Sequence, residues 1–461
     1  MAINPEYKDF TSRAAQAINN PGKQESVVLA LNQHETAINN ALKQFSKLSV
    51  ARQKAGYLKY KVINELDRYL IEFEDNFLAN GGKVIWARDA AEAKLEIKKI
   101  IKNHQVTKAV RSKSMVFEEI GLGQSLKNSG VEVVETDTAD FIAQLAGEKP
   151  SHMGTPNRIF TQQEVSDLLH VKLSAPENLN PDAAKEFTKN YLQQKIAAAD
   201  ISITGCNFLI SDMGGIATTE NEGNSLATIS LPKIQLVLAG IDMLIPALEN
   251  LDLYWPLLAS YQMGKTISPF NSIITGPRKE GEFSGPEELI LILIDNGRSK
   301  VLEMQKQRQA LTCISCGACA NVCPVYKLVG GETYGTTYQG PVGAVVTPFM
   351  KDFETYKHLS YASTLCGKCD SVCPVNIPLH NLLLYNRNYS IKNGFVTPGE
   401  SRKIRWITKA MTSRKILDMP GSGLKNFLIS ISMKKSWGTQ RALPTVAPKS
   451  FNRQLKENNN S

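Results

Sequence analysis

The sequence predicts an α/β domain with an open, mostly parallel sheet, followed by a smaller helical module rich in cysteine. Two observations lead to this prediction. Segments typical of strands and helices alternate from residue 83 to residue 295, which is the order found in parallel sheets covered by helices. Beyond residue 300 the alternation ends, and seven of the eight cysteines lie between positions 313 and 373.

The first 80 residues predict a helical segment. From residue 25 to residue 78 there is no proline, and Gly56 is the one glycine. Apolar residues recur there at steps of mostly three and four, as one face of an amphipathic helix requires. The glycine pair at positions 81 and 82 favours the end of the last helix.

The region 81–300 predicts the α/β domain. We expect strands at 83–87, 108–114, 131–137, 201–211, 225–230, 233–240 and 288–295, and helices at 89–104, 182–199 and 241–263. Long runs of β-branched residues and leucine, as in ELILILID at 288–295, fit strands that are covered on both faces.

Positive charge is concentrated at the C-terminal end of the chain. Residues 401–461 hold 13 lysines and arginines against two acidic residues, whereas the first 400 residues hold 40 against 42. This distribution does not indicate a nucleic-acid-binding protein. We expect 396–461 to be a basic extension, extended and partly disordered after residue 440. It either is solvated or docks on an acidic partner or an anionic membrane face.

The sequence predicts a cytoplasmic protein, with the basic extension as the candidate for membrane association. No apolar run reaches the length of a membrane-spanning helix, and the N-terminus lacks the basic-then-apolar order of a signal peptide. Thiols stay reduced in the cytoplasm, so clustered cysteines indicate metal or redox chemistry there.

The first cysteine motif matches the C-x2-C-x2-C-x3-C-P run of ferredoxins that hold two 4Fe-4S clusters. It comprises Cys313, Cys316, Cys319, Cys323 and Pro324. The first three thiolates wrap around one cubane, and the fourth, which precedes a proline, points at the neighbouring cluster. Gly317 lets the backbone pass close to the inorganic sulfides.

The second motif repeats this run with one ligand missing. It comprises Cys366, Cys369, Cys373 and Pro374, and Ser363 stands where the first cysteine belongs. The exchange rule assigns Cys313, Cys316, Cys319 and Cys373 to the first cluster, and Cys323, Cys366 and Cys369 to the second. The fourth iron of the second cluster is held by Ser363 or water, or it is absent and the centre has three irons. Zinc sites use closed four-ligand sets and fit this spacing less well. We expect a ferredoxin-type dicluster domain over 301–395.

Candidate catalytic residues of the α/β domain are weaker. The segment 213–224 is predicted to be a loop at a strand end, where α/β sheets place ligands. Its Glu220 and Glu222 fit acid–base chemistry or a solvated loop, and Lys113 fits carboxylate binding or a surface position. Cys206 lies in an apolar run and is expected to be a small buried residue within a strand. No G-x-G-x-x-G motif lies between a predicted strand and a predicted helix, so the sequence does not support an NAD or FAD site.

Several segments together resemble the L-lactate utilisation protein B family over residues 60–451. They are 111–122, 131–137, 145–152, 203–224, 274–299, the two cysteine motifs and 443–451. The seven cysteines with Ser363 in the gap agree with that family.

This resemblance implies a LUD domain, related to the NagB and CoA-transferase folds, joined to a 4Fe-4S dicluster module. It implies an iron–sulfur electron-transfer subunit of an oxidoreductase complex that converts L-lactate to pyruvate and allows growth on lactate. It also implies two partners, a cysteine-rich-repeat iron–sulfur protein and a stand-alone LUD-domain protein. Two alternatives remain open: another 2-hydroxy acid such as glycolate as substrate, or a redox-sensing, ligand-binding role.

Overall fold

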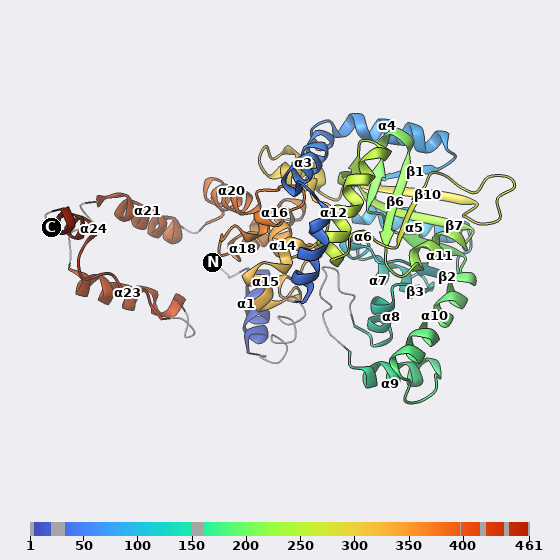
Figure 1. The fold of residues 1–461 in the computed structure, drawn as a ribbon, viewed down its shortest axis with the longest axis horizontal. Helices are drawn as coiled ribbons and strands as arrows, with labels where there is room; N and C mark the ends of the chain where they lie inside the picture. Colours follow the sequence, from blue (N-terminus) through green and yellow to red (C-terminus); the bar gives the residue numbers. More distant parts are fainter. Residues whose placement is uncertain are drawn as a thin grey trace. The chain divides into compact units, whose positions relative to one another are not determined.

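The computed structural model describes residues 4–19, 33–148, 160–396, 398–414, 421–437 and 442–459. The chain divides into two compact units, Met1–Asn388 and Tyr389–Ser461 (Figure 1). Within the described ranges, no helix combines the length and the apolar character that a membrane-spanning segment needs. The start of the predicted N-terminal helix, at 25–32, and part of the segment 145–152 lie outside the described residues.

A six-stranded sheet forms the centre of the first unit, and all of its pairings are parallel. Its strands, in spatial order, are β1 (Lys83–Ala87), β10 (Glu288–Ile294), β7 (Ile234–Gly240), β4 (Ile201–Thr204), β2 (Lys108–Arg111) and β3 (Glu132–Glu135). The open parallel sheet predicted from the sequence is confirmed. Its central strands β7 and β10 are buried except at their first residues, as their largely apolar sequences indicate.

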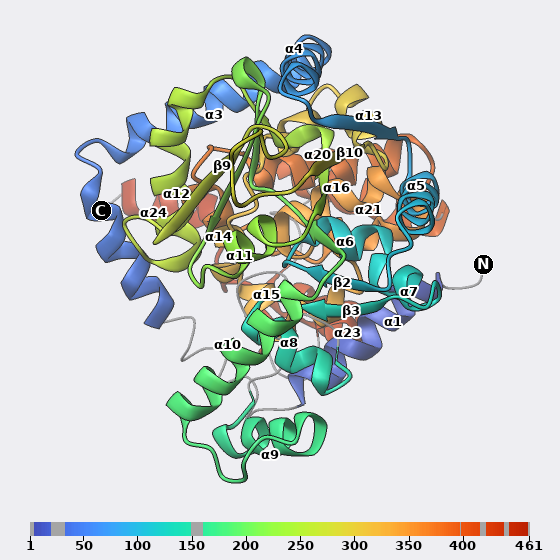
Figure 2. The ribbon, with the colours of Figure 1, turned by 90° about the vertical axis from the view of Figure 1, so that its right-hand side faces the viewer.

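Helices cover both faces of this sheet because successive side chains of each strand point to opposite faces. Ile290 and Ile292 of β10 pack with α5 (Ala90–Asn103), α6 (Met115–Ile120) and α7 (Leu122–Lys127). Leu289 and Leu291 pack on the other face. That face is covered by α3 (Leu48–Asn64) and α4 (Leu66–Ala79), which Figure 2 labels, through Val62, Leu66, Phe73 and Phe77. The N-terminal helical segment is therefore a layer of the α/β core.

A second sheet of four strands lies beside the first. It consists of β8 (Leu244–Ile245), β5 (Phe208–Ile210), β6 (Gly215–Glu220) and β9 (Phe270–Ile274). The helix α12 (Leu251–Met263) lies between β8 and β9 in the chain. Half of the loop predicted at 213–224 is therefore the strand β6. The strand predicted at 225–230 is instead the helix α11 (Asn224–Ser230). The Glu220 carboxylate accepts hydrogen bonds from the backbone N–H groups of Ser225 and Leu226, and this cap starts the helix.

Three further helices pack around the outer strands β2 and β3. They are α8 (Thr138–Leu145), α9 (Gln162–Leu173) and α10 (Pro181–Ala197). Thr161 and Glu164 form a reciprocal capping box at the start of α9, and the Asn180 side chain caps α10.

The cysteine-rich module is built from short helices, as predicted. They are α13 (Arg298–Glu303), η5 (Gln307–Thr312), α14 (Ala318–Asn321), α15 (Pro324–Val329), η6 (Glu332–Tyr334), α16 (Gly340–Met350), α17 (Phe353–Tyr356), α18 (His358–Tyr361), α19 (Lys368–Ser371) and α20 (Leu379–Lys392). Helix α16 is buried over nearly its whole length. The N-terminal helix α1 (Pro5–Ile18) packs on α15 and η6, where Arg13 Nε donates to the Thr333 carbonyl at 3.2 Å.

Helix α3 joins the cysteine module to the sheet. Its Arg52 donates to the backbone carbonyls of Cys373 (2.8 Å) and Asp370 (3.0 Å). One turn further on, an added Cβ on Gly56 would lie 2.5 Å from the Val375 carbonyl oxygen, so only glycine permits this close approach. The domain boundaries at residues 80, 300 and 395 stay predictions.

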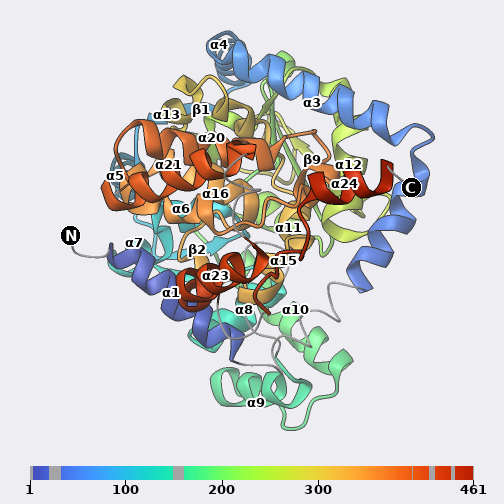
Figure 3. The same cartoon turned by 90° about the vertical axis from the view of Figure 1, so that its left-hand side faces the viewer.

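The second unit contains α21 (Pro398–Thr412), α23 (Ser422–Trp437) and α24 (Phe451–Asn459), which Figure 3 labels. Residues 442–450 form no helix or strand, and the extended tail predicted after residue 440 is instead helical over Phe451–Asn459, in α24.

Candidate iron–sulfur centre

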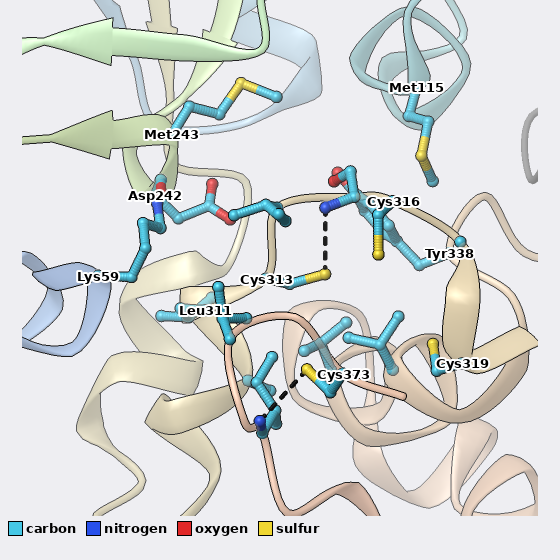
Figure 4. A pocket seen from close by; sticks show the side chains of 18 of the residues that line it. Lys59, Met115, Asp242, Met243, Leu311, Cys313, Cys316, Cys319, Tyr338 and Cys373 are labelled. Atoms are coloured by element: carbon cyan, nitrogen blue, oxygen red, sulfur yellow. Dashed lines mark hydrogen bonds between the residues drawn. The ribbon is translucent and has the colours of Figure 1, made fainter. Parts of the chain in front are cut away.

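A cavity of about 90 Å³ lies at the carboxyl ends of the central strands of the parallel sheet. Four cysteines from both motifs line it, namely Cys313, Cys316, Cys319 and Cys373 (Figure 4). The opposite wall is formed by residues that lie two to four positions beyond the ends of three strands: Cys206 after β4, Asp242 after β7 and Arg298 after β10. Parallel sheets commonly place ligands at this edge. The structure thus brings the first predicted cysteine set to the edge of the α/β domain.

The residues of this cavity fit an iron–sulfur cluster. Burial raises the pKa of the Cys313 thiol to about 12 and that of Cys319 well above its usual range. A buried thiol of this kind ionises when it binds a metal, because coordination replaces the missing solvent stabilisation of the thiolate. The rest of the lining is largely apolar and includes Leu311, Ile314, Val342, Val346 and Ile377. Thiolates in an apolar shell are the donor set of 4Fe-4S clusters.

The other three cysteines form a second group. Cys323 interacts electrostatically with both Cys366 and Cys369. Cys366 is exposed, whereas Cys323 and Cys369 are buried. The two groups are those that the exchange rule predicts, and the ligand assignment itself stays a prediction. Among the described residues, no set of three or more His, Cys, Asp or Glu side chains is placed to hold a single metal ion.

Gly317 has a φ of 74°, which falls in the left-handed region, and its expected close approach to the inorganic sulfides stays a prediction. Gly367 in the second motif has a φ of 76°. Glycine is therefore needed for the backbone turn that precedes each short helix.

A buried ion-pair network forms the wall next to Cys206. Arg298 donates to both carboxylate oxygens of Glu119 at 2.8 Å and to Asp242 at 2.6 Å. The Tyr338 hydroxyl donates to Glu119 at 2.5 Å. Burial alone would raise the pKa of Glu119, but the Arg298 charge and the hydrogen bonds from Arg298, Tyr338 and Asn296 together outweigh it and lower that pKa. Sequence reasoning missed Arg298, whose one signal is its place just after a buried strand.

Lys59 of α3 is a second buried cation at the cavity, with 1% of its surface exposed. Its ammonium group donates to the backbone carbonyls of Asp242 (2.6 Å) and Leu244 (3.0 Å). Burial lowers the pKa of Lys59 to about 8, against the opposing effects of Asp242 and Cys313. Sequence reasoning also missed Lys59, because it is one of several lysines along this helix.

Cys206 lies in the loop between β4 and β5, not within a strand as expected. Its Sγ is 3.9 Å from the Met243 Sδ, and burial raises its pKa to about 12. Cys206 is therefore a partly buried residue of the cavity wall.

The three weak catalytic candidates do not line this cavity. Glu220 caps α11, and Glu222 accepts a hydrogen bond from the Thr138 hydroxyl at 2.7 Å. Lys113 forms an ion pair with Asp140 at 3.3 Å. Each has a local structural partner, and a catalytic role for any of them stays a prediction.

Asp140 should give the stability of the protein a distinct pH dependence. Burial raises its pKa from 3.8 to about 7, and Lys113 only partly offsets this. The folded state binds this proton more tightly than the unfolded state does, so the protonated Asp140 stabilises the fold. This stabilisation is full below about pH 4 and is lost as pH rises to about 7. We expect Asp140→Asn to flatten the fall in the unfolding midpoint between pH 4 and pH 7. The exposed Asp75→Asn serves as control, and an unchanged slope in Asp140→Asn contradicts the prediction.

Comparisons with known proteins agree with this architecture. Residues 70–294 match the family model described as the LUD domain, and residues 309–377 match the one described as a 4Fe-4S dicluster domain. Lactate utilization protein B of Shouchella clausii (strain KSM-K16) is 34% identical, over 98% of this chain and 97% of that protein. Lactate utilization protein B of Macrococcus caseolyticus (strain JCSC5402) is 38% identical, over 77% and 74%.

A further relative is the "Uncharacterized electron transport protein YkgF" of Escherichia coli (strain K12), which is 32% identical over 99% of this chain and 98% of that protein. A solved structure, a DUF162 family protein from Deinococcus radiodurans, is 17% identical and covers 50% of this chain and 98% of its own. Its TM-score of 0.29 is too low to support an argument.

The LUD domain and the 4Fe-4S dicluster domain expected from the sequence are thus both confirmed. Relatives more than 30% identical match over nearly their full length. The chain therefore belongs to the lactate utilization protein B family.

Proposed function

We propose that this chain is the iron–sulfur electron-transfer subunit of a complex that oxidises L-lactate to pyruvate. The observation that carries the proposal is the cavity in which four cysteines face the carboxyl ends of the LUD-domain strands. The names of the relatives support it, since they describe lactate utilization and electron transport. A redox centre at the edge of a sheet where ligands commonly bind links substrate chemistry to electron transfer.

Two cysteine groups supply the ligands in this proposal. Cys313, Cys316, Cys319 and Cys373 hold one 4Fe-4S cluster, and Cys323, Cys366 and Cys369 contribute to the other. Each cluster supplies one-electron chemistry, so a pair matches the two electrons that lactate releases.

The protein residues around the first group exclude water and set the charge. Leu311, Val342 and Val346 provide an apolar wall, and the charge of Arg298 is balanced by the carboxylates bound to it. The Lys59 ammonium group donates to two neutral carbonyl oxygens, so it adds positive charge beside Cys313. The second group reaches the surface at Cys366, where a redox partner can approach.

Two partner subunits complete the proposed enzyme: a cysteine-rich-repeat iron–sulfur protein and a stand-alone LUD-domain protein. The test is to reconstitute the three proteins without oxygen, add L-lactate, and follow cluster reduction by EPR together with pyruvate release. L-lactate is expected to reduce the clusters faster than glycolate does. Faster reduction by glycolate would reassign the substrate. Lactate turnover with clusters that stay oxidised would instead favour a redox-sensing role and contradict electron transfer.

The second unit is proposed to dock on an anionic membrane surface. In α21 the exposed apolar side chains Trp406, Ile407 and Met411 lie among basic residues, and in α23 Leu424, Phe427 and Leu428 are exposed. A basic helix with an apolar stripe that contains aromatic residues is typical of helices lying at a lipid interface.

Truncation after residue 396 should abolish this docking. At low salt the full chain is expected to co-sediment with vesicles containing phosphatidylglycerol but not with purely zwitterionic vesicles, and high salt should weaken binding because it screens the charges. The truncated chain should stay in the supernatant. Equal binding by the two chains refutes the proposal, and binding to an acidic partner protein alone assigns the surface to that partner.

A further inference from the structure

The two cysteine motifs fold alike, although they differ in sequence. The residue before the second cysteine position has a left-handed backbone in both motifs, with φ of 57° at Ser315 and 55° at Leu365. The glycine after that cysteine also has a left-handed backbone in both motifs, with φ of 74° at Gly317 and 76° at Gly367. A four-residue helix then begins in each motif, α14 and α19. Left-handed conformations are costly for residues other than glycine, so their recurrence at Ser315 and Leu365 marks a shared constraint.

Ser363 takes the place of the first cysteine in this shared backbone. In the first motif the Cys313 Sγ accepts a hydrogen bond from the Ser315 backbone N–H at 3.3 Å. In the second motif the Ser363 Oγ accepts the same bond from the Leu365 backbone N–H at 3.1 Å. Arg387 holds this turn by donating to the Ser363 carbonyl at 3.0 Å. The serine oxygen therefore occupies the position that corresponds to a ligand sulfur.

The remaining positions of the motifs correspond in order. The pairs are Cys316 with Cys366, Cys319 with Cys369, and Cys323 with Cys373. In the first motif the leading three positions line one cavity together with Cys373 of the other motif. The reciprocal arrangement places the leading three positions of the second motif with Cys323, and Cys323 does interact with Cys366 and Cys369.

Asp370 is the other oxygen donor close to this group. Its Oδ1 accepts from the Cys369 thiol at 3.3 Å and from the His380 backbone N–H at 3.0 Å, and its Oδ2 is bonded to the His380 ring. Both carboxylate oxygens are thus engaged with α20. The corresponding residue of the first motif is Ala320, which has no donor atom. The shared geometry therefore favours Ser363 over Asp370.

We propose that the Ser363 oxygen is the fourth protein ligand of the second cluster, completing a set with three thiolates. This assignment rests on the proposed function, which supplies the clusters. On binding, the O–H bond of Ser363 breaks, an iron–oxygen bond forms and the proton passes to solvent. The route to solvent is short because Ser363 is half-buried and Cys366 is exposed. The second cluster is then a four-iron centre with no open coordination position.

Replacement of the Ser363 hydroxyl tests the assignment on the full chain, purified and reconstituted without oxygen. We expect about eight irons per chain in the wild type and about seven in Ser363→Ala, whose second centre becomes a three-iron cluster with its own EPR signal in the oxidised state. Ser363→Cys should restore the four-iron centre. Ser371→Ala is the matched control, because its hydroxyl bonds only the Lys368 carbonyl, and it should match the wild type.

Four outcomes overturn the assignment. The first is that Ser363→Ala has the iron content and EPR spectrum of the wild type, and the second is that Ser363→Ala and Ser363→Cys both lose iron. The third is a three-iron second centre in the reconstituted wild type. The fourth is that Asp370→Asn loses the fourth iron while Ser363→Ala keeps it. Each of these leaves the first cluster visible, so it speaks against the serine ligand alone. A wild-type chain that binds no iron and sulfide at all would instead refute the proposed function.

Discussion

Cys373→Ala is expected to abolish the cluster whose other ligands lie 54 or more residues earlier in the chain. Cys373 belongs to the second motif by sequence, but its side chain lines the cavity of Cys313, Cys316 and Cys319. Alanine removes the thiolate and offers no substitute donor. We expect loss of about half of the bound iron and of one EPR-detected centre.

Cys366→Ala provides the matched comparison, because it lies in the same motif but in the other cysteine group. Removal of the Cys366 thiolate should abolish the other centre, the one that survives in Cys373→Ala. The measurement is iron and sulfide content together with EPR of the dithionite-reduced proteins. If the two variants lose the same centre, each motif binds its own cluster and the exchange between motifs is wrong.

Arg298→Met is expected to lower the free energy of unfolding by about 3–5 kcal/mol. Arg298 and Glu119 are almost fully buried, with side-chain exposures of 2% and 4%. Methionine fills a similar volume but leaves the Glu119 and Asp242 carboxylates without their cation. An uncompensated buried charge is far more costly than the loss of a surface pair.

The control is Arg278→Met, whose pair with Glu287 is much more exposed and should contribute less than about 1 kcal/mol. Adding Glu119→Gln to Arg298→Met should recover part of the loss, because it removes one of the stranded charges. Denaturant unfolding of the reconstituted proteins measures both effects. A loss in Arg298→Met as small as in the control would show that the network does not stabilise the fold.

The sequence predicts the parallel sheet and the cysteine groups because both depend on local patterns. Unbroken apolar runs such as 288–294 identify buried strands, and the spacing of the cysteines places successive thiolates in one loop. The errors also have local causes. The alternation in SLATIS at 225–230 suggests a strand, but the Glu220 carboxylate, five residues earlier, caps a helix there.

The wall of the cavity was beyond sequence reasoning because it is assembled from distant segments. Lys59, Asp242 and Arg298 come from a helix and two strand ends, and none of them belongs to a motif. Likewise, nothing in the pattern of α1 shows that Arg13 bonds a carbonyl 320 residues away. Such contacts follow from the order of strands in the sheet and from helix packing, which spacing along the chain does not specify.

The attachment of α3 to the second cysteine motif makes the start of this helix sensitive to iron supply. Arg52 is anchored on the carbonyls of Cys373 and Asp370, a segment that the proposed cluster ligands would hold in place. Without iron the start of α3 would lose this anchor, whereas Lys59 and Val62 would still attach the rest of the helix to the sheet. A loosened helix end is a site where proteases cut. Chains without clusters would then be degraded faster than loaded ones.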